Sequence, residues 1–387
     1  RRVSSSPSST WNWVDLLGQN GIKGKRLGAI MMKRFLTDLS LDSLKGLAEE
    51  AGLKPFAAAQ IAQWIYQKHT DSVDAMTNIS RDGRSRLNAI CEVDPIEVDA
   101  VHGSSDGTRK LLCRAKSDGA IVECVLIPAG DGRTTVCIST QVGCLMGCAF
   151  CRTGSMGFTR NLTQGEIVSQ LLIAMRGSEN PVTNVVLMGM GEPLENYDGV
   201  AGAIRIFCDD SGLAMSRRRI TLSTCGLIPE LDRFSREFDV KIAISLNASS
   251  DDVRNRLMPI NKKYPIAKIM DFCHGYTKRS RHRITFEYVM LGGVNDSESD
   301  AKRLVSLLKG VDAKINLIPF NPFEGSQFRS PDSSTVEWWS EYLYNCGIQT
   351  NIRASRGRDI MAACGQLKSE SEKQRASARR AAERTAA

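Results

Sequence analysis

The chain has 387 residues, 42% of them hydrophobic, and 51 Lys and Arg against 43 Asp and Glu give a net charge of +8. The chain is longer than a typical single domain, and its hydrophobic content is enough for a substantial core. No apolar run approaches the roughly 20 residues of a membrane-spanning helix, so we expect no membrane association. The modest basic excess suits a polyanionic partner.

Twelve cysteines without a signal-peptide pattern indicate a reducing compartment and reactive or metal-bound thiols, which excludes a disulfide scaffold. The first ten residues are basic, rich in Ser and free of acidic residues, as in the remnant of an organelle transit peptide. Residues 1–34 are therefore expected to be such a remnant or simply disordered. The corresponding location is a chloroplast or mitochondrion, with the cytoplasm as the alternative.

A small helical domain is expected over residues 35–92. One helix lies between Ser40, its N-cap, and Gly52, its stop signal, and a second follows Pro55. The apolar sides of the two helices consist of Leu41, Leu44, Leu47, Ala48, Ile61, Trp64 and Ile65.

The rest of the chain has the pattern of a β-rich connector followed by an α/β domain. β-like segments separated by Asp-Gly turns cover 93–132, at 97–101, 109–114 and 120–127. Strands are then expected at 134–139, 184–188, 219–223, 240–246, 283–290, 314–319 and 350–353. Helices are expected near 163–176, 197–209, 227–237, 265–278, 298–309 and 332–345. This alternation predicts a partial (β/α) barrel over 133–367 rather than an open sheet. Residues 368–387 have no apolar face and are expected to be a disordered charged tail.

Three cysteines, Cys144, Cys148 and Cys151, have the spacing CxxxCxxC. Three thiolates leave one iron of a 4Fe–4S cluster without a protein ligand, and an open iron can bind a small molecule and pass it an electron. The alternatives are a zinc site or cysteines that only pack. Zinc sites usually show CxxC pairs with a fourth Cys or His at a matching distance, and none follows Cys151. The spacing therefore favours the cluster.

Polar residues follow four of the expected strands. Because the carboxyl ends of parallel strands meet at one edge, these residues are expected to form one binding site beside the cysteine loop. Glycines there let the backbone approach a ligand, and a carboxylate can accept from an amino group. The strand-end positions expected in the site, including one Gly and one Leu that contribute backbone, are Gly191, Glu192, Ser223, Ser245, Leu246, Asn247 and Asn321.

The cysteine motif and the Gly-Glu-Pro that follows the second barrel strand resemble those of the radical S-adenosylmethionine (SAM) superfamily. The longer motifs STQVGC, MGMGEPL, IPFNPF and AACGQL resemble the RlmN/Cfr group of RNA methyltransferases over residues 40–367. The resemblance implies methylation of adenine carbon 2 in large-subunit (23S-type) rRNA and, in bacterial members, in tRNA. It also implies a monomer that receives electrons from a donor such as flavodoxin or ferredoxin.

The resemblance also implies a role for each matching residue. Cys144, Cys148 and Cys151 hold one 4Fe–4S cluster, and two molecules of SAM are used per turnover, one of them bound at the open iron. The polar residues at the strand ends hold SAM, although many members have His where this chain has Asn247.

Three further residues acquire roles only through the resemblance. From the residues alone, Cys364 and Cys137 are interpreted as packed core and Glu123 as an exposed strand residue. In the family, the residue matching Cys364 is methylated, loses a hydrogen to a 5′-deoxyadenosyl radical and joins the base. The residue matching Glu123 accepts a proton, and that matching Cys137 attacks as a thiolate, releasing the RNA as a transient disulfide bond forms.

RNA contacts are less specific in the sequence. The basic runs at 217–219 and 278–283 are typical of solvated surface, although an enzyme acting on RNA needs phosphate contacts. The resemblance makes 35–92 an RNA-binding accessory domain, and a base within folded RNA must be swung out to reach the barrel.

Three alternatives remain open at this point. A Cfr-like enzyme methylates carbon 8 with the same machinery. A radical SAM enzyme could act on a peptide or metabolite, although such an enzyme needs no methyl-carrying thiol. The third alternative is a non-enzymatic, zinc-bound RNA-binding protein.

Overall fold

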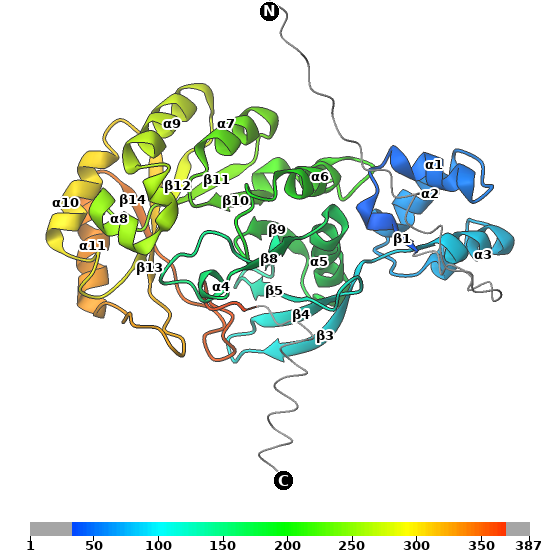
Figure 1. Cartoon of the computed structure of the whole chain (residues 1–387), viewed down its shortest axis with the longest axis horizontal. Coiled ribbons are helices and arrows are strands. Elements are labelled where there is room, and N and C mark those ends of the chain that lie inside the picture. The colour runs from blue at the N-terminus through cyan, green and yellow to red at the C-terminus, as the bar shows by residue number, and fades with distance from the viewer. Residues whose placement is uncertain (1–32, 369–387) are drawn as a thin grey trace, which may run out of the picture. The chain divides into compact units, whose positions relative to one another are not determined.

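The computed structural model describes residues 33–368, and its main feature is a ten-stranded sheet of order β14-β13-β12-β11-β10-β9-β6-β5-β4-β3 (Figure 1). The strands from β6 to β14 are parallel to one another. They are β6 (Thr134–Cys137), β9 (Val182–Leu187), β10 (Ile220–Thr224), β11 (Lys241–Ser245), β12 (Ile284–Met290), β13 (Ala313–Pro319) and β14 (Gln349–Ile352). Within residues 33–368 β14 and β3 do not pair, so the barrel is partial, as predicted.

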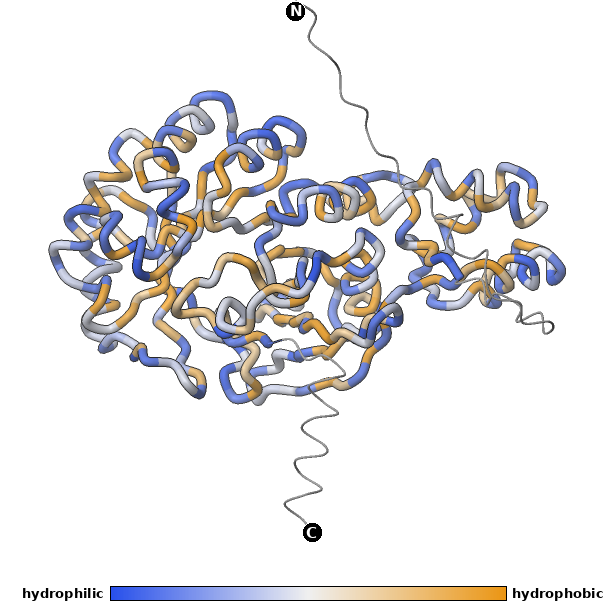
Figure 2. The backbone as a smooth tube through the Cα atoms, viewed as in Figure 1, coloured by the Kyte–Doolittle hydropathy of each residue, from blue (hydrophilic) through white to orange (hydrophobic). Residues whose placement is uncertain are grey.

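Helices cover the outer face of the parallel strands (Figure 1). The predicted helices are present with bounds shifted by one or two residues: α5 (Gln164–Gly177), α6 (Tyr197–Cys208), α7 (Ile228–Glu237), α9 (Ile266–Arg279), α10 (Glu298–Leu307) and α11 (Ser333–Asn345). Capping boxes fix the starts of α5, at Thr163 and Glu166, and of α10, at Ser297 and Asp300. Hydrophilic residues colour the outer turns of these helices, and hydrophobic residues concentrate on the strands beneath (Figure 2).

The segments expected as a β-rich connector extend the same sheet. β3 (Ile96–Gly103), β4 (Arg109–Ala115) and β5 (Ile121–Pro128) form an antiparallel meander, and β5 pairs with β6. The barrel sheet therefore continues beyond its first parallel strand. Short elements that the sequence did not indicate are β7 (Gln141–Gly143), α4 (Arg152–Ser155), β8 (Phe158–Asn161) and α8 (Asp251–Leu257).

The N-terminal part of the described chain is helical, as expected. Its elements are β1 (Arg34–Phe35), η1 (Leu36–Asp38), α1 (Ser43–Glu50), α2 (Ala57–Ala62), η2 (Gln63–Gln67), η3 (Val73–Ala75), α3 (Arg81–Ile90) and β2 (Cys91–Glu92). The predicted apolar face is buried at Leu44, Leu47, Ile61 and Ile65. Two contacts join this part of the chain to α5. The Gly165 amide donates a hydrogen bond to Asp38 at 2.7 Å, and Arg176 forms an ion pair at 2.6 Å with Asp94, which follows β2.

Two of the sequence predictions lie outside the described residues. These are the transit-like or disordered start, apart from its last two residues, and the charged tail beyond residue 368. Within residues 33–368, no helix is both long and apolar enough to cross a membrane.

Candidate active site

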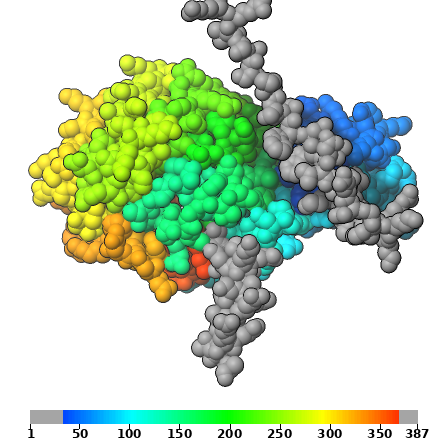
Figure 3. Space-filling view, in the orientation of Figure 1, coloured from blue at the N-terminus to red at the C-terminus, as the bar shows by residue number. Residues whose placement is uncertain are grey.

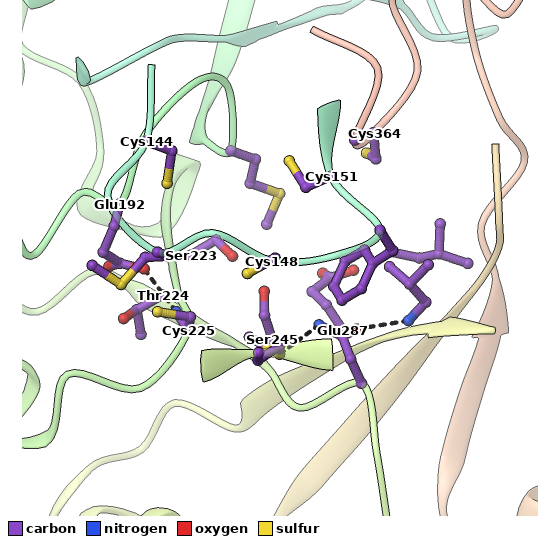
Figure 4. Close-up of a pocket in the computed structure, with 18 of the residues that line it drawn as sticks. Cys144, Cys148, Cys151, Glu192, Ser223, Thr224, Cys225, Ser245, Glu287 and Cys364 are labelled. Carbon is purple, nitrogen blue, oxygen red and sulfur yellow. Dashed lines mark hydrogen bonds between the residues drawn. The ribbon is translucent and has the colours of Figure 1, made fainter. Parts of the chain in front are cut away.

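The CxxxCxxC cysteines line a pocket at the carboxyl ends of the parallel strands (Figure 4). The pocket encloses about 170 Å³, and its walls come from the ends of β9 to β13 and from the segment after β14. The cysteine loop lies between β7 and α4 and is anchored by backbone hydrogen bonds. The Cys144 amide donates to Gly157 at 2.8 Å, and the Ala149 amide donates to Leu257 at 2.9 Å. Distant parts of the chain thus hold the loop over the strand ends.

The donor set of this loop fits an iron–sulfur cluster. Burial raises the pKa of all three thiols, that of Cys144 to about 12, so binding as thiolates must release protons. Within residues 33–368, no three His, Cys, Asp or Glu side chains are grouped around a point that could hold one metal ion. Three thiols from one loop match the protein ligands of a 4Fe–4S cluster that keeps one open iron, so the donor set fits a cluster.

Gly191 and Glu192 form one wall of the pocket after β9. Gly191 has φ +100°, and a Cβ there would lie 2.6 Å from Cβ of Gln141, so only glycine fits. Glu192 is buried, and its carboxylate accepts hydrogen bonds from the amides of Cys225 at 2.8 Å and Leu194 at 3.1 Å. Burial raises the pKa of Glu192, whereas these donors oppose the increase. The backbone therefore fixes the carboxylate at the pocket wall.

The predicted residues after β10 and β11 divide into pocket-lining and supporting residues. Ser223, Ser245 and Asn247 line the pocket. Leu246 is fully buried and contributes backbone only, because its carbonyl accepts from buried Arg254 at 3.0 Å.

The side-chain amide of Asn247 is already engaged. The residue has φ +57°, and its Oδ1 accepts from the Val289 amide at 2.8 Å. Its Nδ2 lies 3.3 Å from Sδ of Met258. These contacts fix the loop, and they compete with the hydrogen bond to SAM that was expected of the Asn247 side chain.

The segment after β14 brings Cys364 to the cysteine loop. The Arg152 amide donates to the carbonyl of Gly365 at 2.8 Å, and the Thr153 hydroxyl donates to Leu367 at 2.6 Å. In Figure 3 this end of the described chain (red) lies against the segment that carries the loop. Asn321 does not line the main pocket; it lines a small neighbouring cavity, and its Nδ2 donates to the carbonyl of Cys364 at 3.3 Å.

The interpretation of Cys364 as a buried packing residue is wrong, because its side chain is exposed and lines the main pocket. Cys137, at the end of β6, is buried as expected, and its thiol lies close enough to Cys364 for an electrostatic interaction. All twelve cysteines are free thiols. Burial, reinforced by Cys364, raises the pKa of Cys137 to about 12, although Arg353 opposes the increase.

The interpretation of Glu123 as an exposed strand residue is also wrong. Its side chain is buried on β5, forms an ion pair with Lys110 at 3.0 Å and accepts from the Lys368 amide at 3.1 Å. Burial raises the pKa of Glu123, and Lys110 opposes the increase. Glu123 lines a cavity with Met361 rather than the main pocket, so the structure does not bring it to the cysteine loop.

Sequence reasoning missed three charged residues: two line the pocket, and the third supports its wall. Arg254 is fully buried on α8 and donates to the carbonyls of Cys225 at 2.7 Å and Ser245 at 3.1 Å, which ties β10 to β11. Glu287 and Arg353 both line the pocket. Two features of the sequence could have indicated the last two: Glu287 is a lone Glu in the largely apolar strand ITFEYVM, and Arg353 directly follows the last strand.

The two basic runs lie away from the pocket or are paired. Residues 217–219 are exposed and precede β10, at the opposite end of the strand from the pocket. In the second run, Arg279 forms an ion pair with Asp232 at 3.0 Å and Arg283 with Asp312 at 2.7 Å. Both runs have the features of solvated surface.

Comparisons with known proteins agree with this site. The family model of the radical SAM superfamily matches residues 138–305, and that of the ribosomal RNA large subunit methyltransferase N-terminal domain matches 35–93. The dual-specificity RNA methyltransferase RlmN of Pelobacter propionicus is 48% identical over 87% of this chain and 96% of its own length. The RlmN of Geobacter sulfurreducens is 48% identical over 85% and 91%.

A solved structure shares the fold. The crystal structure of a radical SAM methyltransferase from Sphaerobacter thermophilus matches with a TM-score of 0.83 and 42% identity, covering 86% of this chain and 99% of that one. The chain thus belongs to the RlmN family of radical SAM methyltransferases, enzymes that carry a 4Fe–4S cluster and use S-adenosylmethionine.

Proposed function

We propose that this enzyme methylates carbon 2 of adenine in large-subunit rRNA and in tRNA, with Cys364 as the methyl carrier. The observation that carries the proposal is the position of Cys364, which is exposed at the pocket of the cysteine loop and lies near buried Cys137. A radical enzyme acting on a peptide or metabolite needs no such pair of thiols. The names of the relatives, dual-specificity RNA methyltransferases, support RNA as the substrate.

The chemistry explains why a carrier thiol is needed. Carbon 2 of adenine is electron-poor and has no lone pair, so it cannot attack the methyl group of a sulfonium ion directly. When bound, the cluster and SAM supply a one-electron cleavage that gives a 5′-deoxyadenosyl radical. The three loop cysteines would hold the cluster, while Gly191, Glu192, Ser223 and Ser245 would hold SAM against it.

The remaining residues act on the carrier and the base. Sγ of Cys364 holds the methyl group beside the cysteine loop, because two backbone carbonyls next to it are bonded to that loop. The carboxylate of Glu123 would accept the proton that carbon 2 loses, although in this structure it lines a separate cavity and forms an ion pair with Lys110. The electron left on the base after the carrier's carbon radical has added to it would be taken up by the bound cluster. The thiolate of Cys137 attacks Sγ of Cys364, so that the S–S bond forms and the bond from Sγ to the methylene carbon breaks. That carbon takes up a proton to become the methyl group, which frees the methylated RNA and leaves a Cys137–Cys364 disulfide. The next turnover requires reduction of that disulfide.

Partners and location complete the proposal. Residues 35–93 would bind RNA, because the family model matched there is that of an rRNA methyltransferase domain. A small electron-transfer protein of the flavodoxin or ferredoxin type would reduce the cluster, and the enzyme would act as a monomer. The basic, Ser-rich start of the chain supports an organelle address. Imaging of the full chain fused to a fluorescent protein tests this address, and a purely cytoplasmic signal would contradict it.

The function is tested by an anaerobic assay of the reconstituted, reduced protein on protein-free large-subunit rRNA fragments and on tRNA. Nucleosides are then separated by isomer and identified by mass. The proposal predicts 2-methyladenosine in both RNAs. Formation of 8-methyladenosine would identify the Cfr-like alternative, and SAM cleavage without any methylated RNA would point to another substrate.

A further inference from the structure

Glu287 is a buried carboxylate in the pocket wall with one oxygen that has no hydrogen-bond partner. The residue is 5% exposed, and it lines the pocket together with Cys364 (Figure 4). Asn316 donates to Oε1 at 2.8 Å, whereas Oε2 accepts no hydrogen bond. Leaving a buried carboxylate oxygen without a hydrogen-bond donor is costly, so this atom indicates a ligand that donates to it.

The strand register fixes the position of this carboxylate. Glu287 on β12 pairs with Asn316 on β13, which pairs with Asn351 on β14. The amide of Asn351 donates to Oδ1 of Asn316 at 3.2 Å. A row of polar side chains across three strands thus directs Asn316 toward Glu287. This support holds one carboxylate oxygen and leaves the other available.

The free oxygen lies on the side of the pocket where the two thiols are. Nη1 of Arg353 is 3.6 Å from Oε2 of Glu287, which is an ion pair beyond hydrogen-bond distance. The same guanidinium interacts electrostatically with both Cys364 and Cys137. A base that receives its methyl group from Cys364 must lie against that sulfur. The Glu287–Arg353 pair therefore flanks the position of the base, whereas Gly191 and Glu192 belong to the opposite wall, after β9.

We propose that Glu287 and Arg353 recognise the target base, an inference that rests on the proposed function. Oε2 of Glu287 accepts a hydrogen bond from the 6-amino group of adenine, and Arg353 donates to ring nitrogen N1. An acceptor beside a donor matches the Watson–Crick edge of adenine, which presents a donor beside an acceptor. Carbon 2 is bonded to N1, so a guanidinium on N1 and next to Cys364 turns carbon 2 toward the carrier thiol.

The test pairs each side chain with the base atom that it contacts. RNA hairpins carry adenosine, purine riboside (no 6-amino group) or 1-deazaadenosine (no N1) at the target position. For the wild-type enzyme, each analogue is expected to lower kcat/KM on the order of 10- to 100-fold, because a charged group is left unpaired. Glu287→Ala is expected to bring the ratio of kcat/KM for adenosine to kcat/KM for purine riboside close to one. Arg353→Met is expected to bring the corresponding ratio for adenosine and 1-deazaadenosine close to one.

Controls separate base recognition from a structural or cofactor role. Glu230→Ala removes another carboxylate with an unpartnered oxygen, on α7 and outside the pocket, and should keep both ratios. Without reductant, binding of the three hairpins to the reconstituted holoenzyme, measured by fluorescence anisotropy, should show the same ranking without any turnover. SAM cleavage in the absence of RNA should be the same in Glu230→Ala as in the wild-type enzyme.

Each contrary outcome has a distinct meaning. A wild-type enzyme that methylates adenosine and purine riboside equally well overturns the inference without any variant. Loss of SAM binding in Glu287→Ala also overturns it, because Glu287 would then contact the cofactor. A wild-type enzyme that cleaves SAM but methylates adenine in no RNA contradicts the proposed function itself, and this inference with it.

Discussion

The ammonium group of Lys110 lies 3.0 Å from the carboxylate of Glu123, and both side chains are more than nine-tenths buried. The pair joins β4 to β5, beneath the segment that carries Cys364. Lys110 also donates to the carbonyl of Met361 at 3.3 Å, and the Lys368 amide donates to Glu123. One ion pair thus contacts both ends of the Cys364 segment.

Removing the ammonium should make Glu123 a poorer proton acceptor at low pH. Lys110 lowers the pKa of Glu123 against the larger effect of burial, so Lys110→Met raises that pKa further. Because the acceptor must be ionised, the acid limb of the pH–rate profile moves to higher pH. Single-turnover rates of RNA methylation measure the shift, and Lys110→Arg, which keeps the charge, is the control. An unshifted acid limb would show that Glu123 is not the acceptor. Breaking the buried pair should also cost about 3–5 kcal/mol of stability.

Cys364→Ala should abolish methylation of the protein and of the RNA. Because the exposed thiol at the pocket is the proposed methyl carrier, the intact mass of the purified variant should lack one methyl group. Cys346→Ala removes the other exposed cysteine and should keep the methyl group and the activity. A methylated Cys364→Ala protein would refute the carrier role.

Cys137→Ala should stop the reaction after the base has joined the carrier. Without the attacking thiol the RNA stays covalently attached to Cys364. A protein–RNA adduct should therefore accumulate on a denaturing gel, whereas Cys113→Ala, which removes another buried thiol, should release the RNA normally. Free methylated RNA from Cys137→Ala at the wild-type rate would exclude the proposed attack.

Release of RNA should accelerate with pH across the neutral range. The pKa of Cys137 is raised to about 12, so the thiolate fraction grows roughly tenfold per pH unit below that value. Arg353 lowers this pKa, so Arg353→Met should make release slower at every pH in this range. The adduct is formed first, and its decay is then followed by gel after a pH jump. A decay rate that does not depend on pH would show that Cys137 is already ionised when the RNA is bound.

Gly191→Ala should destabilise the pocket wall and weaken SAM binding. The added Cβ would lie 2.6 Å from Cβ of Gln141 at a residue with φ +100°, which costs on the order of 1–3 kcal/mol. A Cβ at Gly130 meets nothing within 4 Å, so Gly130→Ala is the matched control. Thermal unfolding and equilibrium dialysis of SAM measure the two effects. Equal melting temperatures for the two variants would contradict the crowding at Gly191.

Sequence periodicity was sufficient to predict the barrel because each strand and helix carries its own pattern. The polar strand ends Gly191, Ser223 and Ser245 could be placed together from topology alone, since parallel strands end at one edge. The meander β3–β5 was recognised as strands, but its pairing with β6 depends on contacts that no local pattern contains.

The misjudged residues depend on contacts that are distant in sequence. Cys364 lies in a run of small residues typical of a core, yet hydrogen bonds from Arg152 and Thr153 hold its segment at the pocket with the thiol exposed. Glu123 is buried because the segment after β14 covers its strand. The free oxygen of Glu287 depends on three adjacent strands, and no linear motif reveals it.

The most direct test of carbon-2 methylation through Cys364 is the mass of the methyladenosine formed from SAM that carries a trideuterated methyl group. Hydrogen abstraction from the methyl group on Cys364 removes one deuterium, and a proton later replaces it. The expected product is 2-methyladenosine with two deuterium atoms. A product with all three deuterium atoms would show direct transfer without the carrier radical, and 8-methyladenosine would show that the enzyme acts at the other carbon.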